Sequence, residues 1–332
     1  MKLLTLSLAL ASAASVFTSS ASHAAQYCIN SETAFFSALS TSAISVEDDE
    51  IRLVKGLLNI NFNINSPQNI NGDLSLRGGY DAGCSTRADL QAMTQIKAQD
   101  NSIELRPKPS SDIFIERMDF DGMEAFNIYD NFDGDLGAFG LIYVSRSAFR
   151  NANRGLWIHS FRHDVRVENS LFINNNQTYN STGLEITNFF NFDAQQDYLV
   201  SVVNCTMRGN THGVVINRGL AGPRLTPTLV NTISTDNVID VKLARRTYIH
   251  HSMFKTLSLG MEGELTTGSG NNLSTDPLLD VNHRPKSGSL AIDSGDNAAV
   301  AVPLKARDYY GNTRIIGPTV DRGAVEKTVF GF

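Results

Sequence analysis

The sequence predicts an all-β chain that winds into a single-stranded, right-handed parallel β-helix, a solenoid, with a short capping helix at its N-terminal end. Three observations lead to this prediction. Short apolar strands of period two recur along the middle of the chain, their aligned positions keep one residue class, and no helical pattern separates them. Such units bury their apolar faces only by stacking on one another, as the coils of a solenoid do.

One type of strand recurs six times. The segments read IFIERMDF, IYVSRSAF, VRVENSLF, VSVVNCTM, PTLVNTIS and TYIHHSMF, and they begin at Ile113, Ile142, Val165, Val200, Pro227 and Thr247. Two further columns of mostly apolar residues are Ile115, Val144, Val167, Val202, Leu229 and Ile249, and Phe120, Phe149, Phe172, Met207, Ser234 and Phe254. The starts lie 20 to 35 residues apart, so loops of unequal length are expected. A β-sandwich is the alternative, but it would not keep a residue class in register through six units.

A second type of strand recurs between these segments. It reads AFNIY, GLWIH, GLEIT, GVVIN and VIDVK, beginning at Ala125, Gly155, Gly183, Gly213 and Val238. The columns expected to face the core are Phe126, Leu156, Leu184, Val214 and Ile239, and Ile128, Ile158, Ile186, Ile216 and Val241. Because side chains alternate along a strand, the remaining columns should face outward. They are Asn127, Trp157, Glu185, Val215 and Asp240, and Tyr129, His159, Thr187, Asn217 and Lys242.

Asparagine recurs near the ends of the first type of strand. It stands at Asn169, Asn204 and Asn231, and again at Asn174, Asn210 and Asn237. Asn tolerates a left-handed backbone and hydrogen-bonds turns. We therefore expect these side chains to stack at corners of the solenoid rather than to bind a ligand.

The N-terminal part of the sequence has the pattern of an exported protein. Residues 1–24 combine a positively charged start, an apolar run and a small-x-small cleavage sequence, which is typical of a secretory signal peptide and too short for a membrane span. Residues 25–332 are then expected to form one β-helix domain, with 25–50 as its N-terminal cap. The segment NSETAFFSALS predicts the capping helix, which Asn30 or Ser31 begins.

Three cysteines follow the predicted signal peptide. Export permits a disulfide, and Cys28 and Cys84 both lie in the N-terminal part, so we expect them to pair. Cys205 lies within an apolar strand pattern, which predicts a buried free thiol. No CxxC motif or Cys/His cluster indicates zinc.

Residues 271–326 carry the most specific pattern in the chain. It reads NNLSTDPLL, SGSLAIDSGD, RDYYGNTR and VDRGAVE in that order. This block resembles the C-terminal segment of bacterial secreted β-helix proteins called choice-of-anchor Q domain proteins, and LRGGYDAGC from Leu76 is similar to their early coils. The residues that carry the match are Asp276, Pro277, Ser289, 291–295, Asp308, Gly311, Asn312, Arg314, Ile315 and 320–326.

The resemblance implies a secreted β-helix. That family is named for its varied surface-anchoring tails, and here the sequence departs from it, since only KTVFGF follows Glu326. This ending has no sortase motif and no apolar tail followed by basic residues. The expected location is therefore secreted, periplasmic or at the cell surface, without covalent anchoring.

The acidic residues of the same block allow a structural or a chemical interpretation. They are Asp293, Asp296, Asp308 and Asp321. Each stands among Gly, Asn and Arg residues that favour tight turns, so we expect them to cap turns, to pair with Arg307, Arg314 or Arg322, and to maintain the last coils. Two alternatives stay open: a Ca²⁺ site, because carboxylates on turns suit this hard cation, and catalysis.

The outward columns of the second strand form the candidate binding site. Adjacent coils lie about 4.8 Å apart, so Trp157, Tyr129 and His159 are expected close to Glu185. An aromatic ring beside a carboxylate and an imidazole suits a sugar, because the ring stacks on it and the polar groups hydrogen-bond or transfer protons. The candidate residues are Asn127, Tyr129, Trp157, His159, Glu185, Asp240 and Lys242. An ordinary mixed solvent face is the alternative.

These features favour an exported β-helix protein that acts as a glycan-binding or adhesin-like module. The alternative is a polysaccharide lyase or glycoside hydrolase that uses the face around Trp157 and Glu185. Glu185 and Asp240 would lie about 10 Å apart, which is marginal for an inverting pair. Whether the chain is an enzyme stays open, and no catalytic residue is assigned.

Composition limits the partners. The formal charge is −6 and Lys and Arg do not cluster, which argues against nucleic acid and anionic membranes. No later run is apolar and long enough to cross a bilayer. The pair His250–His251 lacks an identifiable third ligand, so neither a metal nor another cofactor is expected, apart from the open Ca²⁺ alternative. A monomer that meets a polysaccharide or cell-surface glycan is the expectation.

Overall fold

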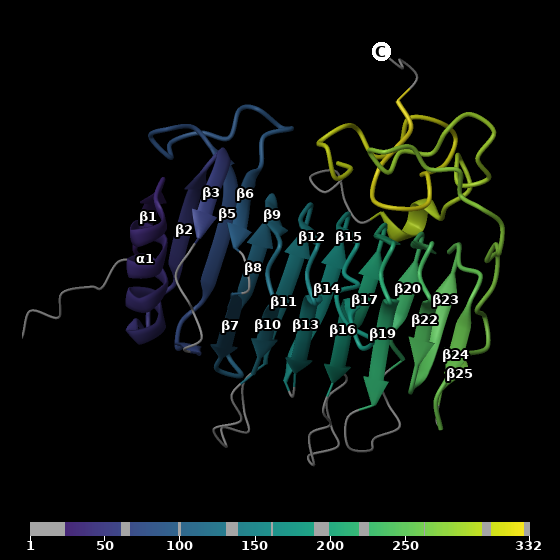
Figure 1. Ribbon diagram of the computed structural model, residues 1–332, viewed down its shortest axis with the longest axis horizontal. Coiled ribbons are helices and arrows are strands. Elements are labelled where there is room, and N and C mark those ends of the chain that lie inside the picture. Colours follow the sequence, from purple (N-terminus) through teal and green to yellow (C-terminus); the bar gives the residue numbers. More distant parts are fainter. Residues whose placement is uncertain are drawn as a thin grey trace, which may run out of the picture.

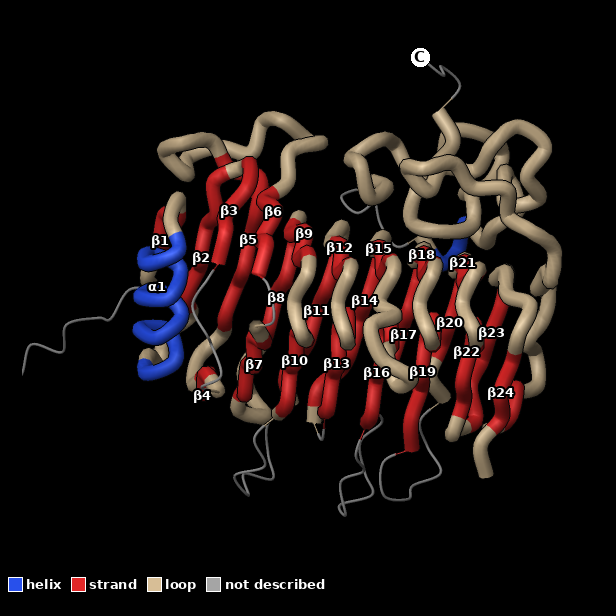
Figure 2. The backbone as a smooth tube through the Cα atoms, viewed as in Figure 1, coloured by secondary structure: helices blue, strands red, loops and turns tan. Residues whose placement is uncertain are grey.

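The chain winds through three parallel sheets in turn, so that a complete coil adds one strand to each sheet (Figure 1). The computed structural model describes residues 24–60, 67–98, 101–130, 139–160, 162–188, 199–218, 226–261, 263–300 and 307–328. Figure 2 shows the strands stacked along one axis with the helix at one end. The predicted all-β parallel β-helix is confirmed. The proposed signal peptide lies outside the described residues, apart from Ala24.

We call the sheets A, B and C in the order in which a coil visits them. Sheet A has ten strands: β1 (Gln26–Ile29), β2 (Asp49–Val54), β5 (Leu74–Tyr80), β8 (Ile113–Glu116), β11 (Gly140–Ser145), β14 (His163–Glu168), β17 (Val200–Val203), β20 (Thr228–Val230), β23 (Arg246–His250) and β25 (Glu264–Leu265). Sheet B has seven: β3 (Gly56–Ile60), β6 (Thr94–Ala98), β9 (Met118–Asp121), β12 (Ala148–Arg150), β15 (Leu171–Ile173), β18 (Thr206–Arg208) and β21 (Ile233–Thr235). Sheet C has eight: β4 (Gln68–Ile70), β7 (Ser102–Pro107), β10 (Ala125–Tyr129), β13 (Arg154–Ser160), β16 (Thr182–Asn188), β19 (His212–Arg218), β22 (Ile239–Leu243) and β24 (Leu257–Leu259).

The core consists of the columns that the repeats predict. In sheet A, Ile113 pairs with Ile142, and the register continues through Val165 and Val200, all fully buried. In sheet B, Phe120, Phe149 and Phe172 pair in register, and consecutive rings stack with centroids 5.1 and 5.4 Å apart. Stacking therefore repeats the same contact from coil to coil, which is why one residue class persists in each column.

A residue with a left-handed backbone stands at each of seven consecutive corners between sheets A and B, from the corner after β8 onward. These residues are Arg117, Arg146, Asn169, Asn204, Asn231, His251 and Asn271, with φ between 47° and 59°. Three of them belong to the predicted Asn series, which confirms the expected corner role. Because Asn adopts this conformation more readily than most residues, the corner explains why Asn recurs there.

A buried Asn ladder lies at the next corner, between sheets B and C. The side-chain amide of Asn175 donates to Oδ1 of Asn210 (3.0 Å), and that of Asn210 donates to Oδ1 of Asn237 (3.0 Å). The predicted series named Asn174 here, which was wrong by one position because Ile173 pairs with Arg208. Asn174 instead takes the left-handed conformation beside the ladder.

The register of β22 differs from the prediction by two residues. Val214 pairs with Val241 and not with Ile239, so Asp240 does not face outward. It is buried and follows the row of glycines on β13, β16 and β19, and its carboxylate accepts hydrogen bonds from the backbone N–H of Lys255 (2.8 Å) and Thr256 (3.0 Å). The segment IDVKL offers two apolar pairs, Ile239 with Val241 and Val241 with Leu243, and only the neighbouring coils decide between them.

The N-terminal end is closed as the sequence predicts. Helix α1 (Glu32–Ile44) covers the first coil and buries Phe35 and Leu39 against the core. Ser31 is its N-cap and accepts a hydrogen bond from the backbone N–H of Ala34. The predicted disulfide Cys28–Cys84 is confirmed, and it joins β1 to the turn after β5.

The C-terminal segment folds back over the solenoid and does not add coils to it. After Leu273 it leaves the stack and crosses the outer side of sheet B (Figure 1). Tyr309, Ala324 and Val325 pack there on residues of β12 and β15. The backbone N–H of Ala324 donates to the hydroxyl of Thr206 on β18 (2.9 Å). The acidic block was expected to form and maintain the last coils of the solenoid. This position was wrong, because the block lies against the side of the solenoid.

The register makes a direct prediction for β16. Ile186 is buried between Ile158 and Ile216, so its replacement by Ala should lower the unfolding free energy by about 2–5 kcal/mol. Replacing Glu185, on the opposite face, by Ala should lower the unfolding free energy far less, by about 0.5–1.5 kcal/mol, because its side chain contributes one hydrogen bond. Urea unfolding midpoints of both variants measure the difference, and similar losses would contradict this register.

Candidate functional site

The outer face of sheet C brings most of the predicted site residues together. One row runs through Asn127, Trp157, Glu185, Val215 and Lys242, and the next runs through Tyr129, His159, Thr187 and Asn217. Both rows cross β10, β13, β16 and β19, so neighbouring side chains are one strand spacing apart, about 4.8 Å. The structure thus confirms the predicted neighbourhood of these residues, except for Asp240.

The rings on this face form one connected group. The Trp157 ring meets the His159 ring edge to face with centroids 4.0 Å apart, and the Tyr129 ring stacks on His159 at 5.3 Å. The guanidinium of Arg154 lies 4.2 Å from the centre of the Trp157 ring. The Trp157 indole N–H is buried and makes no hydrogen bond with any described residue, so this ring faces a ligand through its partly exposed carbon atoms.

Glu185 stands beside this group and is only partly exposed. The side-chain amide of Asn217 donates to its carboxylate (2.6 Å) and also contacts the hydroxyl of Thr187 (3.3 Å). Burial raises the pKa of Glu185, although Arg154, Lys242 and the Asn217 amide act in the opposite direction. A carboxyl group with a raised pKa next to aromatic rings is a feature of binding and catalytic sites, and also of structural clusters.

His159 is held in its neutral form. Burial, together with the smaller effect of the positive charge of Arg154, lowers its pKa to about 4. A neutral imidazole offers one donor and one acceptor. At neutral pH this ring is therefore a hydrogen-bonding group and not a second positive charge on the face.

The spacing of carboxylates on this face does not suit glycoside hydrolysis. Asp240 lies inside, which removes the pair that the sequence suggested. Glu104 is aligned with Asn127 and so lies three strands from Glu185, about 14 Å. Inverting hydrolases hold their two carboxyl groups about 6.5–9.5 Å apart and retaining ones about 5–5.5 Å. These two rows offer no such pair among the described residues.

One sequence-based expectation for this face concerns the segment NFFNFDAQQDY from Asn188. Its aromatic residues either cover a coil or form a binding lip beside Trp157. Residues 189–198 lie outside the described residues, so the lip is still an expectation from the sequence.

A buried polar cluster that the sequence pattern does not reveal lies between sheets C and A. Asp130 accepts a hydrogen bond from the backbone N–H of Arg162 (2.8 Å) and lies 3.0 Å from Nδ1 of His163. Nε2 of His163 contacts the carbonyl of Ser111 (3.0 Å), and the Ser160 hydroxyl contacts Asp130. The residue types match a Ser-His-Asp triad, but Ser160 does not meet the imidazole nitrogens and the cluster is closed to solvent. Residues separated by about one coil form it, which no local motif reveals.

A second buried cluster holds the C-terminal segment together. The fully buried Arg314 donates to the backbone carbonyl of Asp321 (2.7 Å), and its Nε lies 3.7 Å from the carboxyl of Glu326. Asp308 accepts the backbone N–H groups of Asn312 (2.7 Å) and Glu326 (3.1 Å). The capping role predicted for Asp308 is thus seen, but Arg314 contacts Glu326 and backbone carbonyls rather than the predicted Asp carboxylates.

The remaining acidic residues border a cavity of about 310 Å³ in this segment. Asp293, Asp321, Glu326 and Lys327 line it together with apolar side chains. The carboxylate of Asp321 is occupied by the backbone N–H groups of Asp293 and Lys327 (both 2.7 Å). Because its oxygens already hold two turns, Asp321 has a structural use that needs no ligand.

Comparisons of the chain with protein-family models, with curated proteins and with solved structures found no match.

The Glu326 carboxyl predicts a specific pH dependence of stability. Burial raises its pKa to about 8 from an ordinary 4.5, so the folded state keeps a proton that the unfolded state releases. The unfolding free energy should therefore fall as the pH rises from about 4.5 to about 8. Glu326→Gln should flatten this dependence in urea unfolding series, whereas the exposed-carboxylate control Glu264→Gln should keep it. An unchanged slope in Glu326→Gln would show that the carboxyl is ionised in the fold.

Proposed function

We propose that the outer face of sheet C binds a carbohydrate chain. The observation that carries this proposal is the joined group of Tyr129, His159 and Trp157 beside the Glu185–Asn217 pair. Rings bind the apolar faces of sugars, while carboxylates and amides bind their hydroxyl groups. A chain laid along the axis of the solenoid would meet one new pair of side chains at each strand.

Binding without turnover is the function that this geometry supports best. The carboxylate spacing disfavours hydrolysis, as described above. Arg154 and Lys242 flank Glu185 and add positive charge to the face, which suits a polysaccharide that carries some acidic groups. A fold alone does not determine an activity, so the proposal depends on these side chains.

The cellular setting that we propose is outside the cytoplasm. The disulfide indicates an oxidising compartment. The described ranges contain no helix with the length and apolar character of a membrane span. Export by an N-terminal signal peptide is a proposal that depends on the pattern of residues 1–24. Kinship with choice-of-anchor Q proteins is a proposal that depends on the sequence resemblance.

Trp157 allows this function to be tested without a label, since it is the only Trp in the chain. We expect its fluorescence to change when the protein is titrated with neutral and acidic polysaccharides. Calorimetry of Trp157→Ala and Glu185→Gln should show weaker binding, by about 1–3 kcal/mol for loss of one stacked ring. This range of free energies is that of a nucleobase stacked on an aromatic side chain.

Phe114→Ala provides the matched control, because it removes a half-buried ring from sheet A, where Phe114 packs against Tyr143. It should bind as the unaltered protein does. An equal loss of polysaccharide affinity in Phe114→Ala and Trp157→Ala would refute the site, and so would the absence of any polysaccharide binding. Release of new reducing ends or of unsaturated sugars would instead identify an enzyme.

A further inference from the structure

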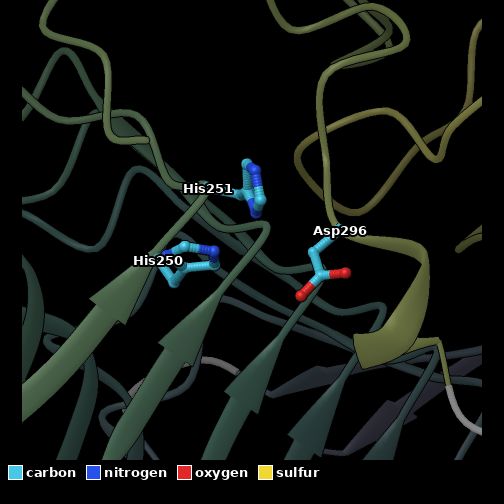
Figure 3. Close-up of side chains that lie close together, drawn as sticks. All are labelled: His250, His251 and Asp296. Atoms are coloured by element: carbon cyan, nitrogen blue, oxygen red, sulfur yellow. The ribbon is translucent and has the colours of Figure 1, made fainter. Parts of the chain in front are cut away.

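Three side chains that could hold a metal ion meet where the C-terminal segment crosses the end of sheet A. His250 ends β23, His251 occupies the next corner, and Asp296 comes from the fold-back segment. One ligand atom of each lies within 4.8 Å of the other two. Figure 3 shows the two imidazole rings and the carboxylate around one shared space. The sequence suggested the His pair and lacked the third ligand, because Asp296 lies 45 residues further along the chain.

The backbone of Asp296 is fixed before any ion binds. The side chain of Asn231, at the preceding corner, donates to the Asp296 carbonyl (3.0 Å) and accepts from its N–H (2.7 Å). One carboxylate oxygen, Oδ1, accepts the backbone N–H of Ala298 (2.9 Å). Such outer contacts orient a ligand without consuming its other oxygen.

The two imidazoles are also positioned, and each has an unused nitrogen. The His250 ring stacks on Tyr248 with centroids 5.5 Å apart. Nε2 of His251 lies 3.1 Å from the side-chain amide of Asn271, at the following corner. Nδ1 of His250 and Nδ1 of His251 are both buried and make no hydrogen bond within the described ranges. A buried nitrogen without a partner is costly, and a bound ion would satisfy it.

We propose that His250, His251 and Asp296 bind a divalent transition-metal ion, with Zn²⁺ as the probe. Two imidazole nitrogens and one carboxylate oxygen form a donor set that suits zinc and its neighbours in the first transition row. Bonds of about 2.0–2.2 Å in a tetrahedron place ligand atoms roughly 3.4 Å apart, so small side-chain rotations must close the set. A fourth position is left for water or for a ligand from outside.

The charges around the set agree with an ion of this kind. Arg322 opposes a cation, but its guanidinium is engaged with the carbonyls of Ser294 and Ser252. Asp296 supplies the compensating negative charge.

The consequence is a link between the fold-back segment and the solenoid. Arg322 and Asn231 already hold this segment by hydrogen bonds, and an ion would add three strong bonds at the same place. Metal binding favours the state in which its ligands are assembled. The ion should therefore hold the C-terminal segment down on sheets A and B.

The test uses untagged full-length protein freed of metal with a chelator. Calorimetry with Zn²⁺ should show one site per chain, and Co²⁺ should give the visible absorption of a tetrahedral nitrogen–oxygen site. Zn²⁺ should raise the melting temperature and slow proteolysis within the C-terminal segment. These readouts do not depend on glycan binding, so they are independent of the function proposed above.

Two variants are chosen to preserve the fold. His251→Asn keeps a residue that tolerates the left-handed corner, as Asn231 and Asn271 do, and Asp296→Asn keeps the shape of the side chain. In each variant the Zn²⁺ affinity should fall by more than 100-fold, because loss of an outer contact alone lowers metal affinity by about 10–100-fold. Asn271→Ala should lose about 10–100-fold, and the distant control His159→Asn should lose none. Absence of Zn²⁺ binding, or binding unchanged in His251→Asn and Asp296→Asn, would overturn the proposal.

Discussion

The structure depends on one constraint: each coil is completed only by the coil before it and the coil after it. Its backbone hydrogen bonds run to the neighbouring strands, and its apolar side chains contact the equivalent side chains above and below. The residue type that fits at each position of the repeat is therefore restricted by the equivalent residues in the coils above and below. The Phe120–Phe149–Phe172 stack and the Asn175–Asn210–Asn237 ladder satisfy this constraint by apolar and by polar means.

The same constraint explains the parts that are not coils. A stack has two ends and an outer surface, and none of these is covered by the repeat itself. Helix α1 covers the first coil, and the C-terminal segment covers the outer side of sheet B with a small core of its own. Buried polar groups such as Arg314 and Glu326 organise that segment because it lacks a repeating ladder of backbone pairs. The outer face of sheet C carries partly exposed polar and aromatic side chains, and it is the face that we propose as the binding site.

The fold was predictable from the sequence because stacking imposes a periodic pattern on it. The core columns, the capping helix and the outward position of Trp157 and Glu185 all follow from period two and from the alignment of repeats. The pattern failed where it had two solutions, as in IDVKL. There Ile239 with Val241 and Val241 with Leu243 are both apolar pairs, and only the pairing with Val214 and Ile216 decides between them. It also could not reveal contacts between residues outside the repeat. Asp296 near His251 and Asp130 near His163 come together through the path of the chain, which no local motif encodes.

The corners between sheets A and B have a consequence for how such a protein changes over evolution. Each corner demands a backbone conformation and leaves the chemistry of the side chain free, since Arg, Asn and His all occupy it. The side chains of Arg117 and Arg146 donate hydrogen bonds to backbone carbonyls of the loop before β6. The Asn231 side chain hydrogen-bonds the backbone of the C-terminal segment. His251 provides an imidazole for the proposed metal site. The corners thus form a row of regularly repeated attachment positions outside the core. A single substitution there can exchange one attachment for another while the packing of the interior is left as it was.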